Sequence, residues 1–302
     1  PPNDVGFVAS TSRGLDAVVK SIEWLPGDSI VLPSTEFPTA LFAARLLASR
    51  GVVVRSVGVA ADGTLDEANL VAAVDETTRL VVASVVSFRT GQLLDTRALV
   101  ARAHEVGALV FLDAVQALGS VAVEVGDADY VCAASFKWLL GVHGAAGLYV
   151  SPRALEITHA PYVGYRGVVD LFPVHPATEE SYSDARRYQE GLPDYAALAV
   201  LHASLEQLAP LRDEIVHHNR AVTAILRDGL LALGASVLAP GAPRGSLVAF
   251  ETPRFAEITS ALADADVTVW ARDGRVRMSA HAYTTEDDAA TALRVLDTIG
   301  AT

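Results

Sequence analysis

Short apolar runs alternate with longer amphipathic stretches over the first half of the chain. Most of these runs are continuously apolar rather than alternating, a pattern typical of strands that are buried on both faces of a sheet. The runs that we expect to form strands are Gly6–Ala9, Ser29–Leu32, Val52–Val57, Leu80–Ser84, Leu109–Asp113, Tyr130–Ala133 and Gly147–Val150.

The stretches between these runs carry apolar residues at helical spacing. In one of them Leu65, Leu70 and Val74 share this spacing, and Thr64 is the expected N-cap. The expected helices are Ser12–Trp24, Thr39–Ser49, Leu65–Val74 and Thr96–Glu105. Strands that alternate with helices predict an α/β domain built on a mainly parallel sheet.

The pattern changes after Val150. Prolines stand among glycines and aromatic residues from Ser151 to Ala185, so this stretch is expected to form an ordered loop over a site. Beyond it we expect helices and a small α+β unit: helices Tyr195–Leu211, Arg212–Leu233, Phe255–Ala265 and one from Thr285, and strands Ser246–Glu251, Val267–Ala271 and Arg275–Ser279. The prediction is a large α/β domain over residues 1–205 and a small C-terminal α+β domain over residues 206–302.

Composition and charge narrow the classes of protein that fit. Hydrophobic residues make up 51% of the 302 residues and charged residues 20%, which is ordinary for a soluble globular chain. No apolar stretch approaches the roughly 18 residues of a membrane span, and the first residues lack the features of a signal peptide. The net charge of −13 argues against nucleic-acid binding. Cys132 is the only cysteine, so a reducing, cytoplasmic location is expected.

Lysine is rare in this chain and its position is informative. Lys20 and Lys137 are the only lysines. Lys137 follows an apolar run, precedes a glycine-rich turn and lies between Phe136 and Trp138. Burial in such surroundings lowers the pKa of a lysine and leaves a nucleophilic amine suited to Schiff-base formation. A surface lysine that extends its charge into water is the alternative.

Two further features are compatible with a bound cofactor. Asp113 ends a buried strand and Gln116 follows three residues later. A buried carboxylate needs a cation or several donors, and a protonated pyridine nitrogen is one such cation; a helix cap is the alternative. Thr11 and Ser12 stand where a strand turns into a helix, whose N-terminus can bind phosphate. Ordinary helix capping explains these two residues equally well.

Taken together, these residues resemble the class V aminotransferase family of fold type I pyridoxal phosphate enzymes. That family includes cysteine desulfurases, kynureninases, isopenicillin N epimerase-like proteins and carbon–sulfur lyases. The resemblance runs from Phe7 to the C-terminus, and the motifs occur in the family's order: Thr11-Ser12, Thr35-Glu36-Phe37, Thr90-Gly91, Asp113 with Gln116, Ser135 with Lys137-Trp138-Leu139, residues 187–191 and residues 276–279. It implies the family's large cofactor-binding domain and small C-terminal domain. The family also carries an N-terminal arm, which we expect to be absent from this sequence.

The resemblance implies a role in cofactor chemistry for four residues. Lys137 would form the Schiff base with pyridoxal phosphate and then move the proton at Cα of the substrate. Asp113 would pair with the pyridinium nitrogen, and Gln116 would reach the ring 3′ oxygen. Phe37 would lie on the ring face, where the family often has histidine.

The resemblance also implies how phosphate and substrate are held. Thr11, Ser12 and Ser135 would bind the cofactor phosphate. Arg277 would receive the substrate carboxylate through two parallel hydrogen bonds, which suits a guanidinium group. Arg166 is a further candidate for substrate binding, with a solvated loop residue as the alternative.

Several positions depart from the family pattern. Phe88 stands where many members have asparagine, Leu192 replaces the threonine that follows Gly191, and Phe136 replaces a phosphate-binding histidine or tyrosine. These changes predict a pocket that is more apolar than usual. Cys132 lies in an expected strand rather than in a mobile C-terminal loop, so persulfide chemistry on a cysteine is not expected.

We therefore expect a pyridoxal phosphate enzyme that labilises a bond at Cα of an amino acid. The expected reaction is β-elimination of the carbon–sulfur lyase type on a substituted cysteine-like substrate. Transamination and epimerisation are alternatives, because Lys137, Asp113 and Arg277 would serve all three reactions. A non-catalytic interaction protein of the same fold is the alternative outside enzymology, and these three intact residues argue against it.

The remaining expectations concern partners and other ligands. The resemblance implies a homodimer in which the Gly191 loop crosses the interface. No Gly-x-Gly-x-x-Gly follows the first expected strand, which argues against a dinucleotide enzyme. The eight histidines lack zinc-ligand spacing, so no metal site is expected.

Overall fold

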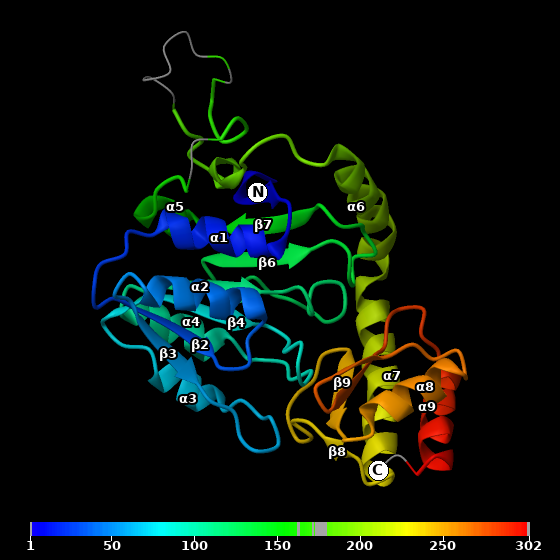
Figure 1. Ribbon diagram of the computed structural model, residues 1–302. Coiled ribbons are helices and arrows are strands. Elements are labelled where there is room, and N and C mark those ends of the chain that lie inside the picture. The colour runs from blue at the N-terminus through cyan, green and yellow to red at the C-terminus, as the bar shows by residue number, and fades with distance from the viewer. Residues whose placement is uncertain (1, 162–163, 171, 173–179, 301–302) are drawn as a thin grey trace.

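The larger of two sheets forms the centre of the protein (Figure 1). The computed structural model describes residues 2–161, 164–170, 172 and 180–300. The larger sheet has seven strands in the order β1-β7-β6-β5-β4-β2-β3. They are β1 (Val5–Val8), β2 (Ser29–Pro33), β3 (Val53–Val57), β4 (Thr78–Ser84), β5 (Leu109–Asp113), β6 (Tyr130–Ala134) and β7 (Ala146–Val150). Neighbouring strands from β3 to β6 pair in parallel, whereas β7 is antiparallel to both β6 and β1. The predicted α/β fold with a mainly parallel sheet is confirmed.

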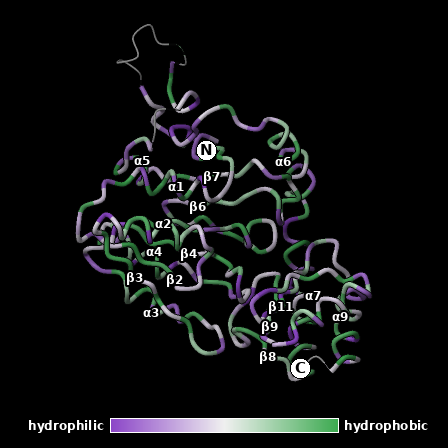
Figure 2. Tube along the Cα trace, in the orientation of Figure 1, coloured by the Kyte–Doolittle hydropathy of each residue, from purple (hydrophilic) through white to green (hydrophobic). Residues whose placement is uncertain are grey.

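Helices cover both faces of this sheet, which buries the strands on each side. Ile30 and Leu32 of β2 pack with α1 and α2, while Val31 between them packs with α3 and α4. Because the strands are buried on both faces, their sequences are continuous apolar runs. In Figure 2 the hydrophobic parts of the trace coincide with these strands. The helices are α1 (Thr11–Ser21), α2 (Pro38–Ala48), α3 (Glu67–Ala72), α4 (Arg97–Glu105) and α5 (Pro152–Ile157), with short 3₁₀ turns at Pro2–Asp4 and Ala185–Tyr188.

The C-terminal part of the chain forms a smaller α+β unit. Its four strands follow the order β10-β11-β9-β8, and each neighbouring pair is antiparallel. Val222 of the long helix α7 and Phe250 of the sheet belong to its apolar core. The elements are α6 (Tyr195–Leu208), a 3₁₀ turn (Ala209–Leu211), α7 (Arg212–Ala232), β8 (Ser236–Val237), β9 (Leu247–Glu251), α8 (Phe255–Ala263), β10 (Trp270–Arg272), β11 (Arg275–Ser279) and α9 (Glu286–Thr298). A domain boundary at residue 205 would fall inside α6, and the division into residues 1–205 and 206–302 stays a prediction.

The start of α3 differs from the expectation. The helix begins at Glu67, and its N-cap is Asp66, whose Oδ1 accepts a hydrogen bond from the amide of Ala68 at 2.9 Å. The expected cap, Thr64, instead donates its own amide hydrogen to Asp62 in a turn. Aspartate caps a helix as well as threonine does. Because Asp66 stands two residues after Thr64, the helix starts two residues later than expected.

The stretch expected to be a loop over a site is also different. It contains the helix α5, which starts at Pro152 after the capping hydroxyl of Ser151. Part of this stretch lies outside the described residues. Helix α5 lies beside α1 against the sheet, and the described residues beyond it extend away from the sheet at the top of Figure 1, on the side opposite the smaller unit. Within the described chain, no helix has both the length and the apolar composition needed to cross a bilayer.

Candidate cofactor and substrate site

The chemistry-bearing side chains meet at one edge of the larger sheet. β1, β2, β4, β5 and β6 run in the same direction, so the loops that follow them gather where these strands end. There they enclose a cavity of about 340 Å³ with a mostly apolar wall. Among the predicted site residues, the cavity wall contains Thr11, Ser12, Phe37, Asp113, Gln116 and Lys137.

Lys137 projects into this cavity from the loop after β6. Burial is the main cause that lowers the pKa of its amine to about 8, and the nearby charge of Arg277 lowers it further. The charge of Asp113 acts in the opposite direction. The turn behind the lysine is closed by hydrogen bonds from Leu140 N to the Lys137 carbonyl and from Gly141 N to the Ser135 carbonyl. An amine held this way is half uncharged at about pH 8, and its uncharged form is a good nucleophile.

Asp113 is a half-buried carboxylate that lacks a full set of partners. It accepts one hydrogen bond, from the amide of Val115 at 2.9 Å. In the described part of the chain it forms no ion pair with an arginine or lysine at contact distance, although the more distant charge of Lys137 acts on it. Burial raises its pKa to about 6. A cation brought into the cavity next to this carboxylate would compensate for its burial.

Gln116 is oriented by its neighbour Trp138. The indole Nε1 donates to Oε1 of Gln116 at 3.0 Å. Because an indole N–H can only donate, the oxygen of the amide must face Trp138 and the NH₂ group is left for the cavity. Gln116 therefore presents hydrogen-bond donors to whatever lies there.

The N-terminus of α1 forms one end of the cavity. Ser10 is the N-cap and accepts a hydrogen bond from the amide of Arg13. The Ser12 hydroxyl pairs with the Thr39 hydroxyl at 2.8 Å, and the buried Oγ1 of Thr11 has no hydrogen-bond partner. The other amides of this first turn have no intrahelical acceptor, so this end of the cavity is suited to an anion.

Ser135 does not join this anion-binding end. It is fully buried and is not part of the cavity wall, and its hydroxyl donates to the Val142 carbonyl at 2.6 Å. The hydroxyl thus fixes the turn that carries Lys137. The hydroxyl of Ser135 has one proton, and that proton is used within the turn. In this arrangement Ser135 therefore does not offer the expected hydrogen bond to a phosphate.

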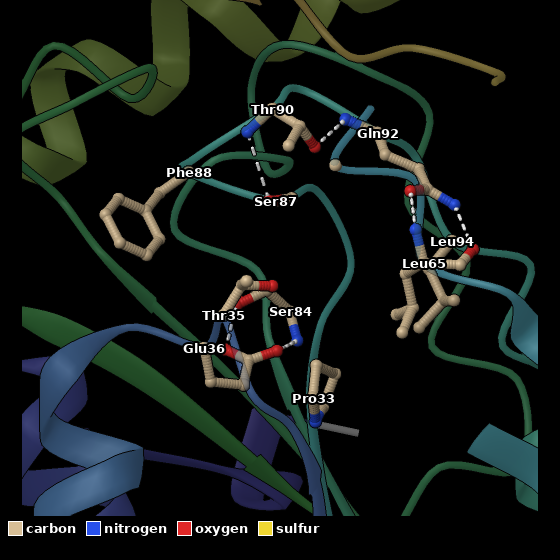
Figure 3. Close-up of a pocket in the computed structure, with 11 residues that line it drawn as sticks. Pro33, Thr35, Glu36, Leu65, Ser84, Ser87, Phe88, Thr90, Gln92 and Leu94 are labelled. Carbon is tan, nitrogen blue, oxygen red and sulfur yellow. Dashed lines mark hydrogen bonds between the residues drawn. The ribbon is translucent and has the colours of Figure 1, made fainter. Parts of the chain in front are cut away.

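Two aromatic rings form the outer wall of the cavity. Phe37 and Phe88 meet edge to face, with ring centroids 5.4 Å apart and an interplanar angle of 78°. In Figure 3 the ring of Phe88 points away from the side of its loop that carries Thr90 and Gln92. The predicted apolar character of the pocket follows from this pair.

Arg277 reaches the same region from β11 of the smaller unit. Its Nη1 donates to the Phe88 carbonyl at 2.7 Å, and its guanidinium carbon lies 5.0 Å from the centre of the Trp270 ring. It is not one of the residues that line the cavity, but its charge acts on Lys137. Its Nε has no hydrogen-bond partner, so it keeps N–H groups for a ligand.

Arg166 is not brought to this site. It lies in a turn of residues 165–167, where Tyr182 N donates to the Gly167 carbonyl and Gly167 N donates to the Gly164 carbonyl. These bonds hold the turn within the segment that extends away from the sheet. Within a single chain, Arg166 therefore does not reach the cavity where it was expected to bind the substrate.

Glu36 is a site residue for which the sequence alone predicted no role. Its carboxylate accepts hydrogen bonds from the amide and hydroxyl of Ser84, both at 2.6 Å, and from the amide of Phe37 at 3.1 Å (Figure 3). Burial raises its pKa to about 7, and the charge of Asp113 contributes in the same direction. No local signal marks Glu36 as a site residue, because the Ser84 groups that hold its carboxylate lie 48 residues away in the sequence.

One protein family matches nearly the whole length of this chain. The family model Aminotransferase class-V matches residues 1–291. A kynureninase from Pseudomonas fluorescens is 30% identical over 260 residues, which cover 82% of this chain and 61% of the kynureninase. A cysteine desulfurase from Pectobacterium carotovorum is 28% identical over 255 residues, which cover 82% of this chain and 62% of the desulfurase. The chain therefore spans less than two thirds of the length of these relatives.

Solved structures give the same fold. The apo cysteine desulfurase from Thermococcus onnurineus NA1 has a TM-score of 0.89 at 21% identity, covering 99% of this chain and 80% of that one. The cystine C–S lyase C-DES, in complex with its product cysteine persulfide, has a TM-score of 0.88 at 25% identity, covering 98% of this chain and 82% of that one. A C-DES variant with glycine covalently linked to its PLP cofactor has a TM-score of 0.87 at 25% identity, with 98% and 81% coverage.

Proposed function

The chain belongs to the class-V aminotransferase family of pyridoxal phosphate enzymes, and we propose that it cleaves the carbon–sulfur bond of a substituted cysteine-like amino acid by β-elimination. The observation that carries this choice is the position of Cys132. It is the only cysteine of the sequence, it lies within β6, and it is fully buried. Burial raises the pKa of its thiol. A thiol held in this way cannot act as a mobile sulfur acceptor, so the sulfur of the substrate would leave directly.

The residues of the cavity fit pyridoxal phosphate. The half-buried carboxylate of Asp113, which forms no ion pair in the described part of the chain, would receive the protonated ring nitrogen, and the free NH₂ of Gln116 would donate to the ring 3′ oxygen. The first turn of α1 would hold the phosphate, with Thr11 and Ser12 beside it. When bound, the cofactor supplies an aldehyde for amines and a ring that accepts electrons. Phe37 would lie against that ring.

Lys137 has two tasks in this proposal. Its amine, with a pKa of about 8, is uncharged in a useful fraction at neutral pH and attacks as a nucleophile. Once released, the same amine takes the proton from Cα of the substrate. For elimination the electron pair of that C–H bond is used to expel the sulfur substituent from the β carbon as a thiolate. The ionised carboxylate of Asp113 would keep the ring nitrogen protonated when the cofactor is bound.

Arg277 would bind and orient the substrate. One of its N–H groups is used by the Phe88 carbonyl, which holds the guanidinium plane in place, and Nε remains free. A carboxylate placed against the guanidinium fork fixes one end of the amino acid. Phe37 and Phe88 would then exclude water around the β-substituent and favour an apolar group there.

The assembly we propose is a homodimer in which the Gly191 loop lies at the interface. Leu192 is 68% exposed in the single chain, and the loop is tied to α1 by an ion pair between Arg13 and Glu190. Leu192 and the exposed Phe7 line one hollow of the surface, and such a group of exposed apolar side chains supports burial against a second copy. A reducing compartment such as the cytoplasm suits the single free thiol.

A product assay tests the reaction. The holoenzyme is incubated with S-methyl- and S-benzyl-cysteine without any amino acceptor, and thiol, ammonia and pyruvate are measured. We expect all three products in equal amounts, with the same yield from Cys132→Ala and none from Lys137→Ala. Turnover that strictly requires a keto acid would identify an aminotransferase instead. Loss of sulfur release in Cys132→Ala would contradict the role assigned to that buried thiol.

A further inference from the structure

A second, smaller cavity lies between α7 and the loop before β9, with arginine side chains around it. Its volume is about 210 Å³. Arg220, Thr223 and Arg227 are spaced three and four residues apart on α7, so they lie on one face of that helix and all line this cavity. Arg244 lines it from the facing loop. None of these four residues lines the cofactor cavity.

Positive charge is concentrated here in a chain whose net charge is −13. Arg227 pairs with Asp228 on the solvent side at 2.8 Å. Arg220 and Arg244 form no ion pair within the described part of the chain, and the guanidinium of Arg244 donates only to backbone carbonyls, including that of Thr90 at 2.6 Å. Burial and the charge of Arg227 lower the pKa of Arg244 to about 10. Three arginines therefore line a cavity whose described lining residues include no carboxylate.

Polar atoms at this cavity also lack partners. Thr223 is 4% exposed, and its Oγ1 forms no hydrogen bond. Nε of Arg244 is likewise buried and without a partner. Buried polar groups in folded proteins are almost always satisfied, and burial without a partner costs free energy. A hydroxyl and a guanidinium N–H that both await an acceptor indicate a ligand that carries oxygen atoms.

We propose that this cavity is a binding site for a small oxyanion of the phosphate class, held by Arg220, Arg227 and Arg244 and by the Thr223 hydroxyl. A phosphate group offers the several acceptor oxygens and the multiple negative charge that such an arrangement can use. A single carboxylate would leave most of the positive charge unbalanced. Anion binding here does not require the function proposed for the cofactor cavity.

The position of this site connects it to the cofactor cavity. Arg244 donates to the Thr90 carbonyl, and the carbonyl of Phe88 on the same loop accepts the hydrogen bond from Arg277. Figure 3 shows Thr90 and Phe88 on this loop, with their side chains on different sides. A bound anion that draws the Arg244 guanidinium toward itself changes the support of the loop that carries Phe88. The expected consequence is a change in the substrate KM when the anion is bound.

Calorimetry with inorganic phosphate tests this proposal. The holoenzyme is titrated at constant ionic strength, with chloride as the balancing anion and with the cofactor's own phosphate already in place. We expect one saturable phosphate site for each chain. Affinity falls at least about tenfold in Arg227→Gln and in the nearly isosteric Thr223→Val, because each removes a hydrogen bond to the anion.

Arg212→Gln is the matched control, since Arg212 is an exposed arginine at the start of the same helix that pairs with Asp213. This variant should bind phosphate like the wild type. The visible absorbance of the bound cofactor verifies that each variant is folded. The absence of saturable binding in the wild type overturns the proposal. An affinity unchanged in both Arg227→Gln and Thr223→Val, or lowered equally in Arg212→Gln, overturns it as well.

Discussion

The indole Nε1 of Trp138 donates a hydrogen bond to Oε1 of Gln116 at 3.0 Å. The indole ring also stacks on His281 from the smaller unit, with centroids 5.2 Å apart and an interplanar angle of 13°. Trp138 thus contacts both parts of the chain and sets which end of the Gln116 amide faces the cavity. The residue directly after Lys137 therefore orients a hydrogen-bond donor toward the cavity.

Removal of this hydrogen bond should weaken cofactor binding. In Trp138→Phe the Gln116 amide is free to rotate, and we expect an affinity for pyridoxal phosphate about fivefold lower, the effect of one hydrogen bond worth about 1 kcal/mol. Titration of the apo-protein followed by visible absorbance measures this affinity. Trp24→Phe is the control, since the Trp24 indole donates to the Val19 carbonyl outside the cavity. Equal affinities for both variants and the wild type would refute the role of Trp138.

Glu36 should make the stability of the protein depend on pH. Its pKa is raised from 4.5 to about 7 by burial, so the folded protein holds this proton more tightly than the unfolded chain. The contribution is fully present below about pH 4.5 and is lost as the pH rises through 7. A shift of this size corresponds to about 3 kcal/mol of unfolding free energy.

Urea unfolding of the wild type and Glu36→Gln at about pH 5 and pH 8 measures this term. Both proteins keep Asp113, so their difference isolates Glu36. We expect the wild type to lose more unfolding free energy than the variant across this range, while the exposed-site control Glu23→Gln follows the wild type. Parallel pH profiles for wild type and Glu36→Gln would show that Glu36 titrates normally.

Capture of pyridoxal phosphate by the apo-protein should depend on the pH through Lys137. Only the neutral amine attacks, so the rate should rise about tenfold for each pH unit below the pKa of about 8 and level off above it. Stopped-flow absorbance gives this profile. A flat profile between about pH 6 and pH 9 would contradict a lysine that titrates in this range.

Arg277 should influence both substrate binding and Lys137. Arg277→Gln removes the carboxylate partner, and we expect kcat/KM to fall by about two orders of magnitude, mainly through KM. Its positive charge also lowers the pKa of Lys137, so the capture profile should shift to higher pH in this variant. Arg272→Gln, at an exposed arginine of the adjacent strand, is the control for both measurements. An unshifted profile would place Arg277 too far from Lys137 to act on it.

Much of the fold was readable because the strands are buried on both faces. The range Leu109–Asp113 was predicted to the residue, since its continuous apolar run ends at a carboxylate. Arg275–Ser279 of the smaller sheet was also predicted to the residue. The helix α3 was placed with the wrong cap because Thr64 and Asp66 are both good caps by residue type. The choice between them depends on a turn in which the Thr64 amide donates to the Asp62 carboxylate. The pattern of apolar and polar residues does not predict this turn.

Some residues of the candidate site could likewise be predicted from the sequence, and others could not. Lys137 and Asp113 were found from local signals, a lysine among apolar neighbours and a carboxylate at the end of a buried strand. Ser135 and Arg166 could not be placed, because each depends on where a turn directs one side chain. Glu36, in the turn after β2, was missed because its partner Ser84 lies 48 residues away, at the end of β4. Contacts of this kind arise only when the sheet has formed.

The two lysines of this chain allow a direct test of the central claim, that Lys137 carries the cofactor. The holoenzyme is reduced with borohydride, digested, and searched by mass spectrometry for the pyridoxyl adduct. We predict that the adduct lies on the peptide containing Lys137 and that the Lys20 peptide is unmodified. An adduct on Lys20, or a holoenzyme preparation without any adduct on Lys137, would contradict the account.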